Sequence, residues 1–127
     1  MDYKKYIKEV PNFPIDGVSF KDISPLLANP KVFRESIQEM GKLVGIKPTE
    51  PPYVTRYPDY WIAVDARGFI FASPLSYNLS KPNILMRKKN KLPAEKYSVD
   101  FELEYGKATL EVHKDSITKE DKVIIID

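Results

Sequence analysis

The stretch YWIAVDARGFIFASP, residues 60–74, decides the fold class of this chain. Its residues 61–64 are apolar and uncharged, which is typical of a strand buried on both faces. A polar turn, 65–68, follows, and the renewed apolar pattern predicts a helix from about Gly68 to Leu79. A strand, a turn and a helix make half of a βαβ unit, so the sequence predicts an α/β fold with a parallel sheet flanked by helices.

Two more runs, 83–86 and 122–127, predict buried strands of the same sheet. In such sheets ligands bind outside the carboxyl ends of the strands. Charged residues gather at this predicted edge: Asp65, Arg67, Arg87, Lys88, Lys91 and Asp127. Several cations there suit a phosphate or pyrophosphate, and the carboxylates suit Mg²⁺ shared with it. The alternative, a solvated basic loop after a strand, stays open on spacing alone.

The rest of the chain predicts helices and a hairpin around that core. Asp2 is expected to cap a helix that runs through Val10. Residues 11–17 are expected to form an irregular segment. Ser24 and Asn29, each before a proline, are expected to cap two helices. Residues 47–59 read as a surface loop. The alternation in 97–105 and 109–113 around a glycine predicts an antiparallel hairpin.

Composition sets the remaining limits. Of the 127 residues, 43% are apolar and 30% charged, and the net charge of +2 is too small to favour nucleic acid or an anionic membrane as partner. There is no cysteine, so disulfides and thiolate metal sites are excluded. No run approaches the roughly 18 apolar residues of a membrane span, so we expect a cytoplasmic protein. Phe20 fits either the core or a stacking platform for a flat ligand, and composition favours the core.

Five segments in order carry a family resemblance: VPNFPIDGVSFKDISPLLANPKVF, DARGFIFASPL, RKKNKLP, FELEYGKATLEVHKD and KVIIID. They resemble the adenine phosphoribosyltransferases over nearly the whole chain. The resemblance implies a type I phosphoribosyltransferase fold with an antiparallel flap hairpin. It also implies the purine-salvage reaction that joins adenine and phosphoribosyl pyrophosphate to give AMP and pyrophosphate, with Mg²⁺, in a cytoplasmic homodimer.

The resemblance also implies roles for individual residues. Phe20 would stack on adenine, with Val18 and Ser19 offering backbone contacts to its edge. Lys21 stands where the family usually has arginine, so a bidentate contact would be lost there. The other substrate contacts would come from residues that bind phosphates, ribose or the flap: Arg67, Arg87, Lys88, Lys91, Tyr105 and Asp127. Glu104 would handle a proton on the purine, while Arg87 can reach across a dimer interface in this family.

The chain ends at Asp127, which matches the first of two family acidic residues that address ribose and metal. We therefore expect one phosphoribosyltransferase domain, 1–127, that lacks the C-terminal part of the fold and the loop that cradles the 5′-phosphate. Within it we expect a purine-binding segment, 1–29, and a flap hairpin, 95–114. Two alternatives remain: a non-catalytic nucleotide-binding or regulatory protein, and a phosphoribosyltransferase for another purine.

Overall fold

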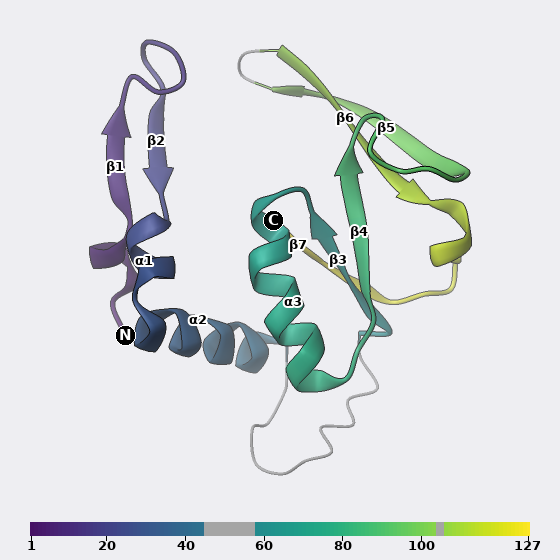
Figure 1. Cartoon of the computed structure of the whole chain (residues 1–127), viewed down its shortest axis with the longest axis horizontal. Helices are drawn as coiled ribbons and strands as arrows, with labels where there is room; N and C mark the ends of the chain where they lie inside the picture. Colours follow the sequence, from purple (N-terminus) through teal and green to yellow (C-terminus); the bar gives the residue numbers. More distant parts are fainter. Residues whose placement is uncertain (45–57, 104–105) are drawn as a thin grey trace. The chain divides into compact units, whose positions relative to one another are not determined.

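The computed structural model describes residues 1–44, 58–103 and 106–127 (Figure 1). The chain divides into two compact units, Met1–Pro48 and Thr49–Asp127. Within the described residues, no helix is long and apolar enough to cross a membrane. The predicted surface loop at 47–59 lies almost wholly outside the described residues.

The first unit begins with the 3-10 helix η1, Tyr3–Tyr6, and an antiparallel hairpin of β1, Lys8–Pro11, and β2, Ser19–Asp22. Asp2 caps η1 as predicted, since its side chain accepts from the Lys4 N–H at 3.3 Å. The expected helix through Val10 is wrong, because Val10 pairs with Phe20 in the hairpin. Local spacing of apolar residues could not reveal a partner strand ten residues away.

Two helices, α1, Ser24–Ala28, and α2, Pro30–Leu43, complete the first unit. Asn29 caps α2 as predicted: its side chain accepts from the Val32 N–H at 3.2 Å, and proline opens the helix. Ser24 does not cap α1; it is the first helical residue, and Asp22 accepts its N–H at 2.8 Å and its hydroxyl at 2.6 Å. Val32 and Ile37 bury the apolar side of α2.

The second unit is built on a sheet that, within the described residues, has the order β5-β6-β4-β3-β7. Its parallel part consists of β3, Tyr60–Val64, with β4, Asn83–Lys88, on one side and β7, Val123–Ile126, on the other. Its antiparallel part is the hairpin of β5, Lys96–Leu103, and β6, Gly106–His113, which is followed by the 3-10 turn η2, Lys114–Ser116. The parallel sheet and the hairpin confirm the predicted fold class.

The helix α3, Arg67–Leu79, connects β3 to β4 and packs on β3, β4 and β7 (Figure 1). The core of this unit lies there, around Trp61 and Ala63 of β3 and Ala72 and Leu75 of α3, all nearly inaccessible to solvent. The first turn of α3 approaches β7 so closely that a Cβ at Gly68 would lie 2.0 Å from the Ile126 carbonyl oxygen. Only glycine fits there.

The strand β4 is longer than its apolar run predicts. We expected it to end at Met86, but Arg87 and Lys88 continue it, paired with Glu111 and Leu110 of β6. The reason is that β6 adds an antiparallel neighbour just where the parallel pairing with β3 ends. The flap hairpin is thus joined to the same sheet as the parallel strands.

Candidate functional site

The carboxyl ends of the parallel strands bring together Arg67 and Asp127, which lie 60 residues apart in sequence. Arg67 is the first residue of α3 and Asp127 directly follows β7. The Arg67 Nη2 atom lies 3.3 Å from the Asp127 Oδ1 atom, and both side chains are more than half exposed, at 53% and 63%. Both charges therefore remain open to solvent and to a ligand.

A second ion pair lies deeper at this edge. The Arg87 Nε atom lies 3.3 Å from Asp65 Oδ2, with side-chain exposures of 32% and 11%. The Arg87 guanidinium also lies 5.9 Å from the centre of the Phe69 ring. Asp65 follows β3, so the predicted meeting of two strand ends is confirmed. The carboxylate and the ring both interact with the arginine.

The start of α3 leaves backbone donors without a side-chain cap. Its N-cap is Ala66, which offers no side-chain oxygen to the first helical N–H groups. These N–H groups, together with the helix dipole, favour an anion at this end of the helix. Arg67 lies in the same turn.

The basic segment after β4 is exposed. Lys88 ends the strand, and Lys89 and Lys91 follow in the turn. None of the three ammonium groups has an ion-pair partner within residues 58–103 and 106–127. Asn90, between them, adopts φ +65°. Its N–H is donated to Glu111 Oε2 at 3.0 Å.

Glu111 was not among the residues that the sequence singled out. It lies in β6 between Leu110 and Val112, and only 4% of it is exposed. Its signal in the sequence is weak: the alternation places Glu111 on the opposite face of β6 from Leu110 and Val112, which reads as the polar face, whereas the structure buries both Glu111 and Val112. That placement emerges only from the tertiary pairing.

In the first unit, the hairpin carries the predicted purine-binding residues. The Phe20 side chain is 41% exposed. The Phe13 ring meets it edge to face, with centroids 5.1 Å apart and an interplanar angle of 71°. One ring is therefore available at the surface while its orientation is supported by a second ring, a common geometry for aromatic pairs.

Lys21 and Ser19 both bind Glu9 of the neighbouring strand. The Lys21 Nζ atom lies 2.6 Å from Glu9 Oε1, and the Ser19 hydroxyl donates to the same oxygen. The hydrogen bonds from Lys21 and then Ser19 lower the pKa of the Glu9 carboxyl. Glu9 was missed because residues 2–10 were expected to form a helix.

Val18 is tied into the hairpin turn. Its carbonyl accepts from the Phe13 N–H at 3.1 Å, and its own N–H is donated to the Ile15 carbonyl at 3.3 Å. A carbonyl oxygen has two lone pairs, so the Val18 oxygen retains a site for a further donor. Its N–H is already in use.

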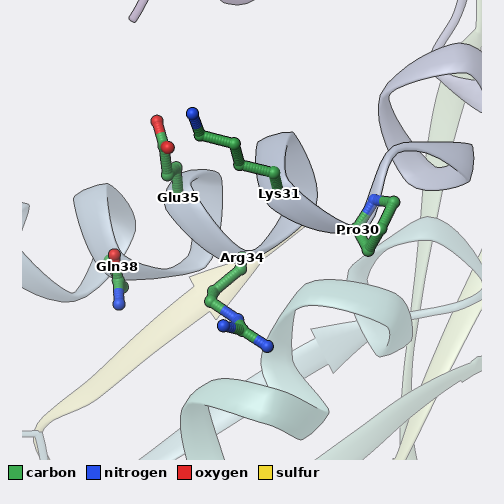
Figure 2. Close-up of a pocket in the computed structure, with 5 residues that line it drawn as sticks. All are labelled: Pro30, Lys31, Arg34, Glu35 and Gln38. Carbon is green, nitrogen blue, oxygen red and sulfur yellow. The ribbon is translucent and has the colours of Figure 1, made fainter.

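Two predicted site residues, Glu104 and Tyr105, lie outside the described residues. A hollow of about 400 Å³ lies along α2, lined by Pro30, Lys31, Arg34, Glu35 and Gln38 (Figure 2). Figure 2 shows that all five side chains come from this one helix, so the hollow is a shallow surface feature. None of the predicted site residues lines it.

Carboxylates at the sheet edge do not form a metal cage. Within the described residues, no group of three or more histidine or carboxylate side chains could hold a metal ion. Mg²⁺ commonly uses one or two carboxylates and takes its other ligands from phosphates and water. An exposed Asp127 at the end of β7 fits that requirement, because Arg67 engages only one of its oxygens.

The sheet order, the hairpin on its antiparallel side and the charged edge define a phosphoribosyltransferase-type α/β fold. No family model matches the chain. The adenine phosphoribosyltransferase of Pelagibacter ubique is 48% identical over 131 residues, covering 100% of this chain and 67% of that protein. That of Carboxydothermus hydrogenoformans is 42% identical, covering 100% of this chain and 69% of its own length. The chain thus spans about two thirds of these relatives.

Solved structures of adenine phosphoribosyltransferases are also similar to this chain. The adenine phosphoribosyltransferase of Thermoanaerobacter pseudethanolicus has a TM-score of 0.82 at 42% identity, over 98% of this chain and 67% of its own. The Saccharomyces cerevisiae enzyme was solved with adenine and an imino-altritol bisphosphate. It has a TM-score of 0.81 at 31% identity, covering 99% of this chain and 69% of its own. The chain belongs to the adenine phosphoribosyltransferase family, glycosyltransferases of purine salvage that form AMP from adenine and phosphoribosyl pyrophosphate.

Proposed function

We propose that the chain takes part in the family's reaction through two separate sets of residues, one in each unit. The hairpin of the first unit would recognise adenine, and the sheet edge of the second would bind the pyrophosphate of phosphoribosyl pyrophosphate. The observation that carries this proposal is the convergence at one sheet edge of Arg67, an uncapped helix start and Asp127. Anion-binding groups and a metal-type ligand meet there.

For adenine, Phe20 supplies a stacking face. Its exposure and its support by Phe13 favour this role over packing in the core. The Val18 carbonyl can accept from the exocyclic amine of adenine, which is a donor, and Ser19 adds backbone contacts. Lys21 is occupied by Glu9 and offers a point charge where an arginine fork would grip two oxygens.

For pyrophosphate, Arg67 and Arg87 supply guanidinium groups, and Lys88 and Lys91 supply point charges. The uncapped N–H groups of α3 add backbone donors. These groups neutralise charge that builds up on the leaving group as its bond to the sugar breaks. The proposal therefore assigns the second unit the task of holding the leaving group.

The reaction displaces pyrophosphate from C1 of ribose through a cation-like sugar, with a purine nitrogen entering in line. Placing the base accurately and excluding water are the protein's other tasks. Glu104 is our candidate to move a proton on the purine, and Tyr105, the next residue in the sequence, is our candidate for a substrate contact. General acid–base catalysis of this kind contributes about 10²–10⁴-fold.

Members of the family typically use Mg²⁺. We propose that Asp127, through the carboxylate oxygen that Arg67 leaves free, helps to hold Mg²⁺ together with the substrate's phosphates. When bound, the ion adds positive charge beside the leaving group. A homodimer, in which Arg87 reaches the partner's site, and a cytoplasmic location are part of the same proposal.

The decisive experiment measures AMP formation from adenine, phosphoribosyl pyrophosphate and Mg²⁺, together with calorimetric titration of adenine and pyrophosphate separately. We expect both ligands to bind. Arg67→Ala should weaken pyrophosphate binding and leave adenine binding unchanged, and Phe20→Ala should do the reverse. If both ligands bind without turnover and an extension carrying the family's 5′-phosphate loop restores AMP formation, the chain is an enzyme fragment. If the extension restores nothing, a nucleotide-binding protein is favoured. Absence of pyrophosphate binding would contradict the assignment of the sheet edge.

A further inference from the structure

A buried carboxylate lies beneath the exposed basic turn. Glu111 and Ser36 are the buried polar residues of the described chain, and Glu111 is the one that carries a charged group. Burying a carboxylate is costly unless it is hydrogen-bonded. Glu111 is therefore expected to have hydrogen-bond partners, and these partners indicate which part of the fold it holds in place.

The main partner of Glu111 is the backbone of the basic turn. The Asn90 N–H donates to Glu111 Oε2 at 3.0 Å, while the Ser98 hydroxyl lies at the outer limit of hydrogen bonding, 3.5 Å from Oε1. Glu111 is also the strand residue paired with Arg87 on one side and Ser98 on the other. One side chain of the middle strand thus connects β5 to the turn that follows β4.

The turn itself brings like charges together. Asn90 adopts φ +65°, a left-handed conformation that asparagine adopts more often than most other non-glycine residues. Its neighbours Lys88, Lys89 and Lys91 are exposed and like-charged, so they repel one another. The hydrogen bond that the Asn90 N–H donates to the buried Glu111 carboxylate fixes the backbone, and the negative charge of the carboxylate offsets part of this repulsion.

We propose that Glu111 is a positioning residue for pyrophosphate. It fixes the turn that presents Lys88 and Lys91, and it makes the position of these cations depend on the hairpin to which Glu111 belongs. The ligand part of this proposal rests on the proposed function of the sheet edge. The alternative is that Glu111 only fills and stabilises the middle of the hairpin.

Two substitutions separate these roles. Glu111→Leu keeps a buried side chain of similar size but removes the acceptor. Glu111→Gln keeps an acceptor for the Asn90 N–H, and its amide group can donate to the Ser98 hydroxyl. Glu95→Gln is the matched control, because Glu95 is an exposed carboxylate beside the same hairpin, 88% accessible and 3.8 Å from Lys114 Nζ.

The experiment combines amide hydrogen exchange at Asn90, followed by NMR, with calorimetric titration of pyrophosphate and of adenine. Glu111→Leu should speed exchange at Asn90 and weaken pyrophosphate binding about tenfold, as loss of a charge-assisted hydrogen bond would. Adenine binding should be unchanged. Glu111→Gln should restore pyrophosphate binding to within about threefold of wild type, and Glu95→Gln should change neither quantity.

Unaltered pyrophosphate binding in a folded Glu111→Leu variant would overturn the proposal, and so would equal losses for both ligands. If Glu111→Leu does not fold, Glu111→Met, which matches the length of glutamate, takes its place. A wild-type chain that bound no pyrophosphate would overturn the proposed function and the ligand part of this inference. The exchange rate at Asn90 would still decide whether Glu111 holds the turn.

Discussion

Two regions hold their predicted ligand-binding groups by different means. One is the hairpin of β1 and β2, and the other is the charged edge of the sheet in the second unit (Asp65, Arg67, Arg87 and Asp127), called the phosphate edge below. In the hairpin, the contacts are between exposed side chains: the pair between Lys21 and Glu9 leaves both more than half accessible. At the phosphate edge, the groups follow buried strands and a helix whose first turn touches the backbone of β7. One region depends on surface contacts and the other on core packing.

This difference has an energetic consequence. Exposed ion pairs contribute little to folding stability and are screened by salt. Close packing against backbone atoms, by contrast, tolerates almost no added side-chain volume. We therefore expect substitutions of the packed residues at the phosphate edge to cost more folding stability than comparable substitutions in the hairpin, where the main effect should be on ligand binding. The predictions below test this contrast, beginning with the largest effect.

The largest effect is expected from Gly68→Ala. The added Cβ would lie 2.0 Å from the Ile126 carbonyl oxygen and 3.0 Å from its carbon, both backbone atoms, so α3 or β7 must shift. We expect a loss of about 3 kcal/mol in the free energy of unfolding. Urea denaturation followed by the fluorescence of Trp61, the sole tryptophan and 1% exposed in β3, measures it.

Gly17→Ala in the hairpin turn is the matched control. No atom lies within 4 Å of the added Cβ, but Gly17 has φ +84°, a conformation that costs an alanine about 1 kcal/mol. Urea denaturation followed by circular dichroism should show this smaller loss in the free energy of unfolding. Equal losses for the two alanine variants would mean that packing against β7 does not distinguish the phosphate edge from the hairpin.

Phe20→Ala is expected to act on binding. Stacking of a base on an aromatic ring is worth about 1–3 kcal/mol, so adenine affinity should fall roughly 5- to 150-fold, with pyrophosphate affinity unchanged. Calorimetric titration of each ligand measures this. Ile15→Ala, at a residue 49% exposed in the same turn, is the control and should leave both affinities as they are. Parallel loss of both affinities in Phe20→Ala would indicate a folding defect instead.

The ion pair between Arg87 and Asp65 at the phosphate edge and the ion pair between Lys21 and Glu9 in the hairpin give a further, smaller contrast. Asp65→Asn removes the charge that faces the partly buried Arg87, and we expect it to cost about 1–2 kcal/mol. Glu9→Gln removes the charge facing Lys21 at the surface and should leave the denaturation midpoint unchanged. Urea denaturation at two salt concentrations compares them. A larger midpoint shift for Glu9→Gln would reverse our ranking of the regions.

Much of the phosphate edge was predictable from sequence, because parallel strands are marked by short uncharged runs and their carboxyl ends share an edge. Trp61 to Val64 and the final isoleucines carry that signal directly. The length of β4 and the burial of Glu111 were not predictable. Both depend on β6 lying beside β4, a pairing that no local pattern encodes.

The hairpin of the first unit was harder to predict for a related reason. Val10 and the aromatic residues before it satisfy a helical spacing, but the pairing of Val10 with Phe20 prevails. Phe20 itself was singled out, and its exposure fits the platform rather than the core. Glu9, which pairs with Lys21, could be identified only after the strand pairing was known.

The smallest effect concerns pH and the far end of the sheet from the phosphate edge. The Tyr60 hydroxyl donates to Asp121 Oδ2 at 2.7 Å. Burial and then this hydrogen bond raise the pKa of Tyr60 to about 12, whereas the bond from Tyr60 and then the Thr118 N–H lower the pKa of Asp121. Asp121 therefore stabilises the fold above its ordinary pKa, an effect lost as acid protonates it. Tyr60 stabilises it below about pH 10, an effect lost as the pH rises toward 12.

Tyr60→Phe removes the Tyr60 effect and the part of the Asp121 effect that comes from the Tyr60 hydroxyl, while the hydrogen bond from the Thr118 N–H remains. The difference in denaturation midpoint between wild type and Tyr60→Phe should be greatest between about pH 5 and pH 9 and should shrink in acid and in base. Pyrophosphate affinity, measured at neutral pH, should not change, because Tyr60 begins β3 while Asp65 and Arg67 follow its end. A pH-independent difference would mean that the hydroxyl contributes through packing alone. A loss of pyrophosphate affinity would mean that the phosphate edge depends on the whole length of β3.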